Sequence, residues 1–144
     1  MSETTTDDDP HEGGCLCGAI RYRLKGLPRD VVHCHCSLCQ RSSGALFVTW
    51  ATVDLRDFEL VQGDPAAFRS SPTAKRLFCP QCGSQLFFHI DDDRRIDVTV
   101  ATLDEPDRVT ATRNTWVDTR REAAKGFDRD LPDYTDEGPE SAHH

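Results

Sequence analysis

Long apolar runs, lysine and clustered basic charge are all scarce in this 144-residue chain. The longest mostly apolar stretch, Ala45 to Val53, is far too short to cross a bilayer, so no membrane partner is expected. Lys and Arg number 17 against 25 Asp and Glu, which gives a formal net charge of −8. Phosphate contacts need clustered Lys and Arg, so the sequence predicts no nucleic-acid partner.

A secretory signal is also missing from the beginning of the chain. The N-terminal residues are acidic and lack both a basic segment and an apolar segment. We therefore expect a cytoplasmic protein. In a reducing compartment, cysteines at C-x-C and C-x-x-C spacing indicate metal ligands or redox thiols rather than disulfides.

The acidic charge is concentrated at the two ends of the chain. Residues 14–127 hold 14 acidic and 16 basic side chains, so the body is near neutral. Its length suits one domain with a real core. We predict a disordered acidic tail over 1–12, a single β domain over 13–127 and a second acidic tail over 128–144.

Alternating apolar and polar residues predict many short strands separated by Gly, Pro and Asp turns. In residues 19–24, for example, Ile20, Tyr22 and Leu24 share one face. Only 37–43 suits a short helix. Further strands are expected at 31–32, 45–52, 58–61, 66–69, 75–78, 85–90, 95–101 and 112–117. The predicted class is mostly β, a sandwich or barrel-like body with little helix, as a monomer or homodimer.

Seven cysteines divide into a group of four and a group of three. The four are Cys15 and Cys17, at C-x-C spacing, and Cys79 and Cys82, at C-x-x-C spacing. They have the number and type of ligands of a closed structural zinc site. A C-x-x-C redox pair is the alternative, but that motif usually sits in a βαβ context, which is absent.

The backbone around the C-x-C pair must bend to let both sulfurs face one metal. Side chains two apart in a straight strand share a face but lie too far apart to chelate comfortably. We expect Gly13, Gly14 and Gly18 to supply the freedom for that bend. The site would then join the first strand to a hairpin 61 residues further along the chain.

The group of three is Cys34, Cys36 and Cys39, and it is one ligand short of a closed zinc site. Three thiolates favour a soft divalent cation, and the open position would take water or a substrate thiol. These cysteines are therefore the candidate catalytic residues as well as metal ligands. Two alternatives remain open: His33 or His35 completes a Cys₃His site, or the cysteines are metal-free and reactive. We expect His35 to point away from the metal, toward substrate or solvent.

Polar residues follow the third cysteine directly and are candidate substrate contacts. Arg41 is suited to a carboxylate, because its guanidinium can bind both oxygens. Gln40 and the Ser42 and Ser43 hydroxyls are suited to amide groups. An exposed surface charge is the alternative reading of Arg41.

Three segments resemble the glutathione-dependent formaldehyde-activating enzyme family, also called the centromere protein V family: Gly14 to Tyr22, Cys34 to Ala45 and Phe78 to Ser84. The resemblance covers about residues 13–120. It implies an Mss4-like zinc-binding β fold, with a structural zinc and a second, labile zinc near the thiol site. By motif, the group of four would hold the first zinc and the group of three the second.

The resemblance also implies an activity, the condensation of glutathione with formaldehyde to S-hydroxymethylglutathione, which is classed as a carbon–sulfur lyase reaction. Our first hypothesis is thus a zinc-dependent lyase or condensing enzyme acting on a small thiol and an aldehyde. The alternative is a non-catalytic, zinc-stabilised module that binds a thiol ligand or a protein partner. Acceleration above the uncatalysed condensation separates the two.

Overall fold

The computed structural model describes residues 9–127, 130–136 and 139 and contains two open sheets. The smaller sheet has the strand order β1-β2-β5, and the larger has the order β10-β3-β4-β9-β8-β7-β6. Neighbouring strands are antiparallel, except that β10 runs parallel to β3. The strands are β1 (His11–Gly14), β2 (Arg21–Leu24), β3 (Asp30–Cys34), β4 (Val48–Asp54), β5 (Phe58–Gln62), β6 (Ala66–Ser71), β7 (Ala74–Phe78), β8 (Gln85–Ile90), β9 (Arg95–Thr99) and β10 (Arg113–Thr115).

The mostly β architecture with little helix is confirmed, although the sheets do not close into a barrel. One α-helix, α1 (Ser37–Ser43), lies where the sequence predicts it and ends at Gly44, whose φ of 74° is left-handed. The described residues also form short 3₁₀ turns: η1 (Leu55–Asp57), η2 (Val100–Thr102), η3 (Pro106–Arg108), η4 (Val117–Thr119) and η5 (Glu122–Ala124). None of the described helices is long and apolar enough to span a membrane.

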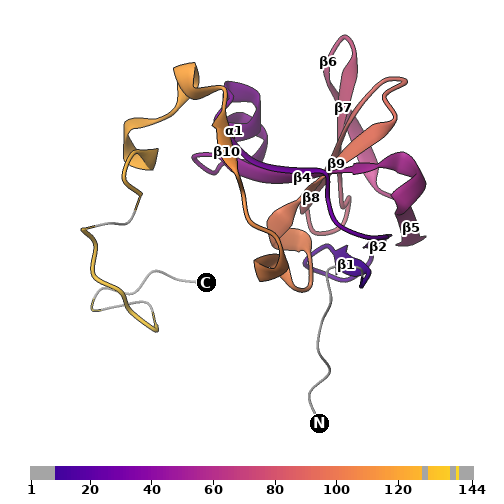
Figure 1. The fold of residues 1–144 in the computed structure, drawn as a ribbon, viewed down its shortest axis with the longest axis horizontal. Coiled ribbons are helices and arrows are strands. Elements are labelled where there is room, and N and C mark those ends of the chain that lie inside the picture. Colours follow the sequence, from indigo (N-terminus) through magenta and orange to yellow (C-terminus); the bar gives the residue numbers. More distant parts are fainter. Residues whose placement is uncertain (1–8, 128–129, 137–138, 140–144) are drawn as a thin grey trace.

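The larger sheet uses both of its faces, and the smaller sheet and α1 lie on opposite sides of it (Figure 1). One face packs against the smaller sheet around Tyr22 and Phe87, whose rings meet edge-on at 5.1 Å. Ala51 and Val53 of β4 belong to this main core. Trp50, one position away, instead packs with the group of three cysteines on the other face. The pleat of β4 thus separates the core from the face that carries the candidate site.

Strand β1 begins at His11, inside the segment that the sequence assigns to the tail. Its pairing with β2 sets His11 opposite Leu24 and Gly13 opposite Tyr22, and His11 is buried. Pairing and burial thus outweigh the low strand propensity of this polar, glycine-rich segment. Residues 1–8 of the predicted N-terminal tail, and residues 128–129, 137–138 and 140–144 of the C-terminal one, lie outside the described residues.

The glycines beside the first cysteine have a different role from the predicted one. Gly13 and Gly14 lie in β1 and allow close approach of neighbouring groups. A Cβ on Gly13 would lie 2.6 Å from the Tyr22 ring and from the Thr102 carbonyl oxygen. Only Gly18, with φ of +82°, adopts the left-handed conformation of a bend.

Candidate metal centres and the adjoining pocket

The group of four cysteines is brought together by two turns. Cys15 and Cys17 lie in the turn after β1, while Cys79 and Cys82 lie between β7 and β8. The Cys17 sulfur is 3.6 Å from that of Cys15 and 3.7 Å from that of Cys79, and all four sulfurs lie within 4.8 Å of one another. All four cysteines are free. The predicted four-thiol cluster is therefore confirmed as a geometric unit.

Hydrogen-bond donors favour the thiolate form of two of these cysteines, Cys15 and Cys82. The Ile20 backbone N–H donates to the Cys15 sulfur at 3.2 Å. A hydrogen bond with the Ser84 hydroxyl, helped by backbone N–H groups, lowers the pKa of Cys82 to about 5. Metal-binding cysteines must be deprotonated, so these contacts suit a soft cation. Four thiol donors at these separations fit zinc.

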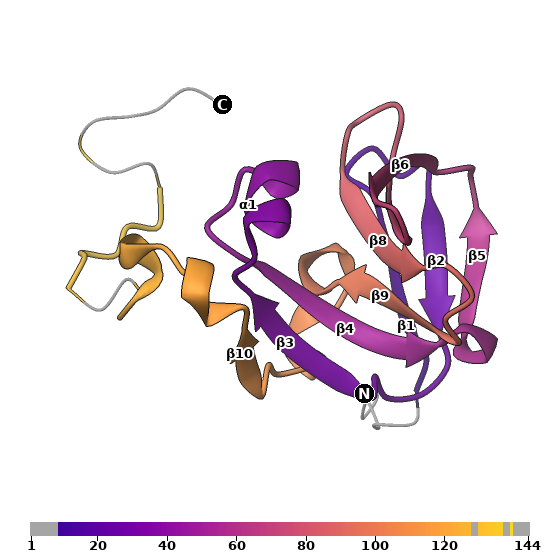
Figure 2. The same ribbon diagram turned by 90° about the horizontal axis from the view of Figure 1, so that it is seen from above.

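The group of three cysteines lies at the junction of β3 and α1 (Figure 2). Cys34 ends β3, and the Cys36 sulfur caps α1 by accepting from the Cys39 backbone N–H at 3.2 Å. The Cys34 and Cys39 sulfurs are 3.5 Å apart. The hydrogen bond from the Cys39 thiol is the main cause that lowers the pKa of Cys34 to about 5, and it raises that of Cys39. The predicted three-thiol cluster is also confirmed as a geometric unit.

Neither nearby histidine reaches this cluster. His33 contacts the Thr49 hydroxyl through Nδ1 at 2.7 Å, and His35 contacts the Asn114 side-chain oxygen through Nε2 at 3.0 Å. Both rings pack against Phe47. His35 is 2% exposed, so it does not meet solvent as the sequence suggested. Within the described chain, no His, Asp or Glu joins the three cysteines as a further ligand.

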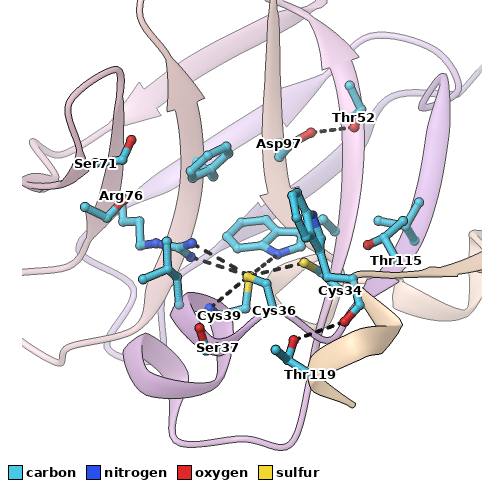
Figure 3. A pocket seen from close by; sticks show the side chains of 16 residues that line it. Cys34, Cys36, Ser37, Cys39, Thr52, Ser71, Arg76, Asp97, Thr115 and Thr119 are labelled. Atoms are coloured by element: carbon cyan, nitrogen blue, oxygen red, sulfur yellow. Dashed lines mark hydrogen bonds between the residues drawn. The ribbon is translucent and has the colours of Figure 1, made fainter.

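A pocket of about 520 Å³ opens over the three cysteines (Figure 3). Strand register builds its floor: Thr52 pairs with Asp97, Asp97 with Phe88, and Phe88 with Arg76. These four residues therefore form one row across β4, β9, β8 and β7. At one end of the pocket are the cysteines with Trp50, whose indole N–H donates to the Cys39 sulfur at 3.4 Å. The volume is within the range of small-molecule sites.

Asp97 gives the pocket a carboxyl group away from the sulfurs. Burial raises the pKa of Asp97, while the short hydrogen bond from the Thr52 hydroxyl and the charge of Arg95 partly oppose the shift. In Figure 3 the pair Thr52 and Asp97 stands apart from the cysteines. Thr52 follows Val48, the partner of Cys34, by four residues along β4, a distance of about 13 Å along a strand.

Arg76 is a pocket residue that the sequence analysis missed. It is 5% exposed, and both terminal nitrogens point at the Cys39 sulfur, at 3.7 and 3.8 Å. Its guanidinium also lies 5.1 Å from the centre of the Phe88 ring. The buried positions Ala74 and Arg76 lie on one face of β7, but the sequence around Arg76 carries no local signal for that burial.

Two of the predicted substrate contacts hold the helix in place instead of lining this pocket. The Gln40 amide nitrogen donates to the His35 and Thr119 carbonyls, and its oxygen accepts from Arg121. The Ser43 hydroxyl donates to the Cys39 carbonyl at 2.7 Å. These contacts fix α1 and the segment around η4.

Arg41 lies in a neighbouring pocket instead. That second pocket has a volume of about 530 Å³ and also includes Ser42. Arg41 is exposed and belongs to the last turn of α1. Of the four residues after Cys39, Gln40 and Ser43 thus anchor the helix, and Arg41 and Ser42 line the second pocket.

A four-thiol cluster that joins two turns, and a three-thiol cluster open to a pocket, define a β protein with two candidate metal centres. The family model described as "Glutathione-dependent formaldehyde-activating enzyme" matches residues 10–119. The chain belongs to this family. Both cysteine groups and all ten described strands lie within the match, which ends at residue 119.

Two relatives are consistent with this assignment. A Schizosaccharomyces pombe (strain 972 / ATCC 24843) protein described as an uncharacterized lyase is 28% identical over 78 residues. That match covers 54% of this chain and 56% of the relative, so the chain spans about half the length of the curated relative it matches. The crystal structure of a Rhodobacter sphaeroides protein is similar with a TM-score of 0.59 and 28% identity, covering 72% of this chain and 99% of that one.

Proposed function

We propose that this protein is a zinc-dependent carbon–sulfur lyase or condensing enzyme that joins a small thiol to an aldehyde, with glutathione and formaldehyde as its substrates. The observation that carries the proposal is the open three-cysteine cluster at one end of the 520 Å³ pocket. Family membership and the lyase description of the S. pombe relative support the same reaction class.

The two centres have different proposed roles. Cys15, Cys17, Cys79 and Cys82 would hold a structural zinc, because four thiols leave no position for a substrate. Cys34, Cys36 and Cys39 would hold the second zinc with one position free. Zinc bound there would supply a Lewis acid that lowers the pKa of a thiol, so that the thiol would be deprotonated at pH 7.

The protein's own side chains would prepare the thiol and shield it from water. Trp50 and Phe88 give the pocket an apolar lining, and Arg76 places a positive charge next to the Cys39 sulfur. In the condensation, the substrate thiol gives up its proton, its sulfur forms a bond to the aldehyde carbon, the carbonyl π bond opens, and the oxygen takes up a proton. Holding both reactants together is the main expected contribution of the pocket.

Acceleration above the uncatalysed reaction is the decisive test. Isotope-labelled formaldehyde and glutathione are mixed with the zinc-loaded protein, and exchange NMR measures the rate of S-hydroxymethylglutathione formation. We expect a rate gain with the wild type and none with Cys36→Ser, which leaves the helix cap in place because serine is also a good cap. Arg56→Gln, an exposed change outside the pocket, is the control and should keep the full rate.

Saturable glutathione binding without any rate gain would refute the enzyme proposal. That result would favour the non-catalytic thiol-binding module instead. A rate gain that survives Cys36→Ser would contradict the assignment of the three-cysteine centre.

A further inference from the structure

Arg76 is a buried cation without a carboxylate partner. None of the ion pairs among residues 9–127, 130–136 and 139 includes it. Its terminal nitrogens contact the Cys39 sulfur and, at 3.4 Å, the Ser42 hydroxyl, while its buried Nε has no hydrogen-bond partner. A guanidinium has five N–H donors, and a buried charge is costly unless it is paired. Arg76 therefore has unused capacity for an anion.

The position of Arg76 links two cavities. It lines both the 520 Å³ pocket over the cysteines and the second pocket of about 530 Å³. Leu38 and Ser70 line both pockets as well. The two cavities are thus neighbours that share a wall formed by these three side chains.

The second pocket is basic, although the chain carries a net charge of −8. Arg41 and Arg76 both line it, and no Asp or Glu does. A further hydrogen-bond donor at its wall, the Ser70 hydroxyl, has no partner among the described residues. Two arginines without a local acid favour a carboxylate, which a guanidinium binds through both oxygens.

We propose that the second pocket is an anion subsite in which Arg41 and Arg76 bind a carboxylate of the thiol substrate. The thiol end would lie at Cys34, Cys36 and Cys39, and the chain of the substrate would cross the wall formed by Leu38 and Ser70. The substrate class is then an extended thiol that carries a carboxylate at a distance from its sulfur. This inference rests on the proposed thiol site, but it assigns the specificity to residues of the second pocket.

Binding to the zinc-loaded protein, measured without aldehyde, tests the subsite. The probes are glutathione and its diethyl ester, which has the same thiol but no free carboxylate. Trp50 and Trp116 are the only tryptophans in the sequence and both line the first pocket, so intrinsic fluorescence reports the binding of either probe. Because hydrogen bonds to a charged group contribute about 1.5–3 kcal/mol, we expect the wild type to prefer the acid by roughly tenfold to a hundredfold.

Two variants separate the subsite from the cysteine centre. Arg76→Gln removes the shared charge, and Arg41→Gln removes a charge from the second pocket only. Each should bring the acid-to-ester preference down toward one. In Arg41→Gln the affinity for the ester should stay close to that of the wild type, whereas Arg76→Gln also removes the charge beside the Cys39 sulfur and should weaken binding of the ester as well. Arg56→Gln, which removes one exposed arginine outside both pockets, should keep the full preference.

The outcomes are distinguishable from those of the proposed reaction. Equal affinity of the wild type for acid and ester, or an unchanged preference in Arg41→Gln, would overturn the subsite even if condensation is accelerated. If Arg76→Gln does not fold, Arg41→Gln alone still decides the question. A wild-type preference for the acid that is lost in both Arg41→Gln and Arg76→Gln would support the subsite even if no rate gain is found.

Discussion

Replacing Cys17 by serine should destabilise the protein far more than the small chemical change suggests. Cys17 is exposed, so the substitution removes no core volume, in contrast to a change at the fully buried Cys79. Its sulfur nevertheless meets that of Cys79 across a separation of 62 residues in the chain. Cys15, Cys79 and Cys82 remain in this variant, so the loss measures the whole metal link between the turn after β1 and the β7–β8 turn when these three thiols no longer hold the metal.

The expected magnitude follows from the entropy of closing that loop. A cross-link over 62 residues restricts the unfolded chain by about 4 kcal/mol at 25 °C, if a metal link is treated like a disulfide. For a domain of this size, that loss lowers Tm by roughly 8–16 °C. The same relation gives about 2 kcal/mol for the link between Cys34 and Cys39, which are five residues apart.

Differential scanning calorimetry of the zinc-loaded wild type, Cys17→Ser and Cys36→Ser measures this contrast. Serine retains the cap of α1 at position 36, so the second variant is a matched loss of one thiol. We expect the Tm loss in Cys17→Ser to be about twice that in Cys36→Ser, and a strong chelator to remove the advantage of the wild type. Equal losses in both variants, or a wild-type Tm that chelation does not change, would refute this reasoning.

Two further predictions concern the main core. Gly13→Ala should lower the free energy of unfolding by about 1–3 kcal/mol, because its Cβ would lie 2.6 Å from the Tyr22 ring and from the Thr102 carbonyl oxygen. Urea unfolding measures this loss, and an unchanged midpoint of the urea transition would contradict the prediction. Burial raises the pKa of Tyr22 to about 12, so the neutral form stabilises the fold below pH 10 and that stabilisation disappears as the pH rises from about 10 to 12. Tyr22→Phe should show a smaller loss of stability over this window in urea titrations, and an identical loss would count against the assignment.

Most strands were predictable because their sequences carry a local signal. Ile20, Tyr22 and Leu24 alternate with arginines, and all three are at most 1% exposed. The helix was predictable from its short polar run and from Gly44, which ends it in the left-handed region. Strand β1 was missed because a segment with two glycines has little strand propensity by itself, and only its pairing with β2 makes it a strand.

The cysteine groups were predictable because each group is made of closely spaced pairs or triplets. The rest of the site depends on register between distant strands, which local periodicity does not reveal. Arg76 and Asp97 reach the pocket through β7 and β9, and each resembles an ordinary surface charge in the sequence. The contacts of Gln40 were unpredictable for the same reason, since its partners Thr119 and Arg121 come from a segment about 80 residues away.

Zinc per chain, determined by native mass spectrometry before and after addition of glutathione, tests the central claim most directly. We expect two zinc ions in the wild type and one in Cys36→Ser. Glutathione should change the zinc content of the wild type or add its own mass to it, and it should do neither in Cys36→Ser. A single zinc that is indifferent to glutathione and to Cys36→Ser would contradict the account, because the pocket would then have no open metal centre.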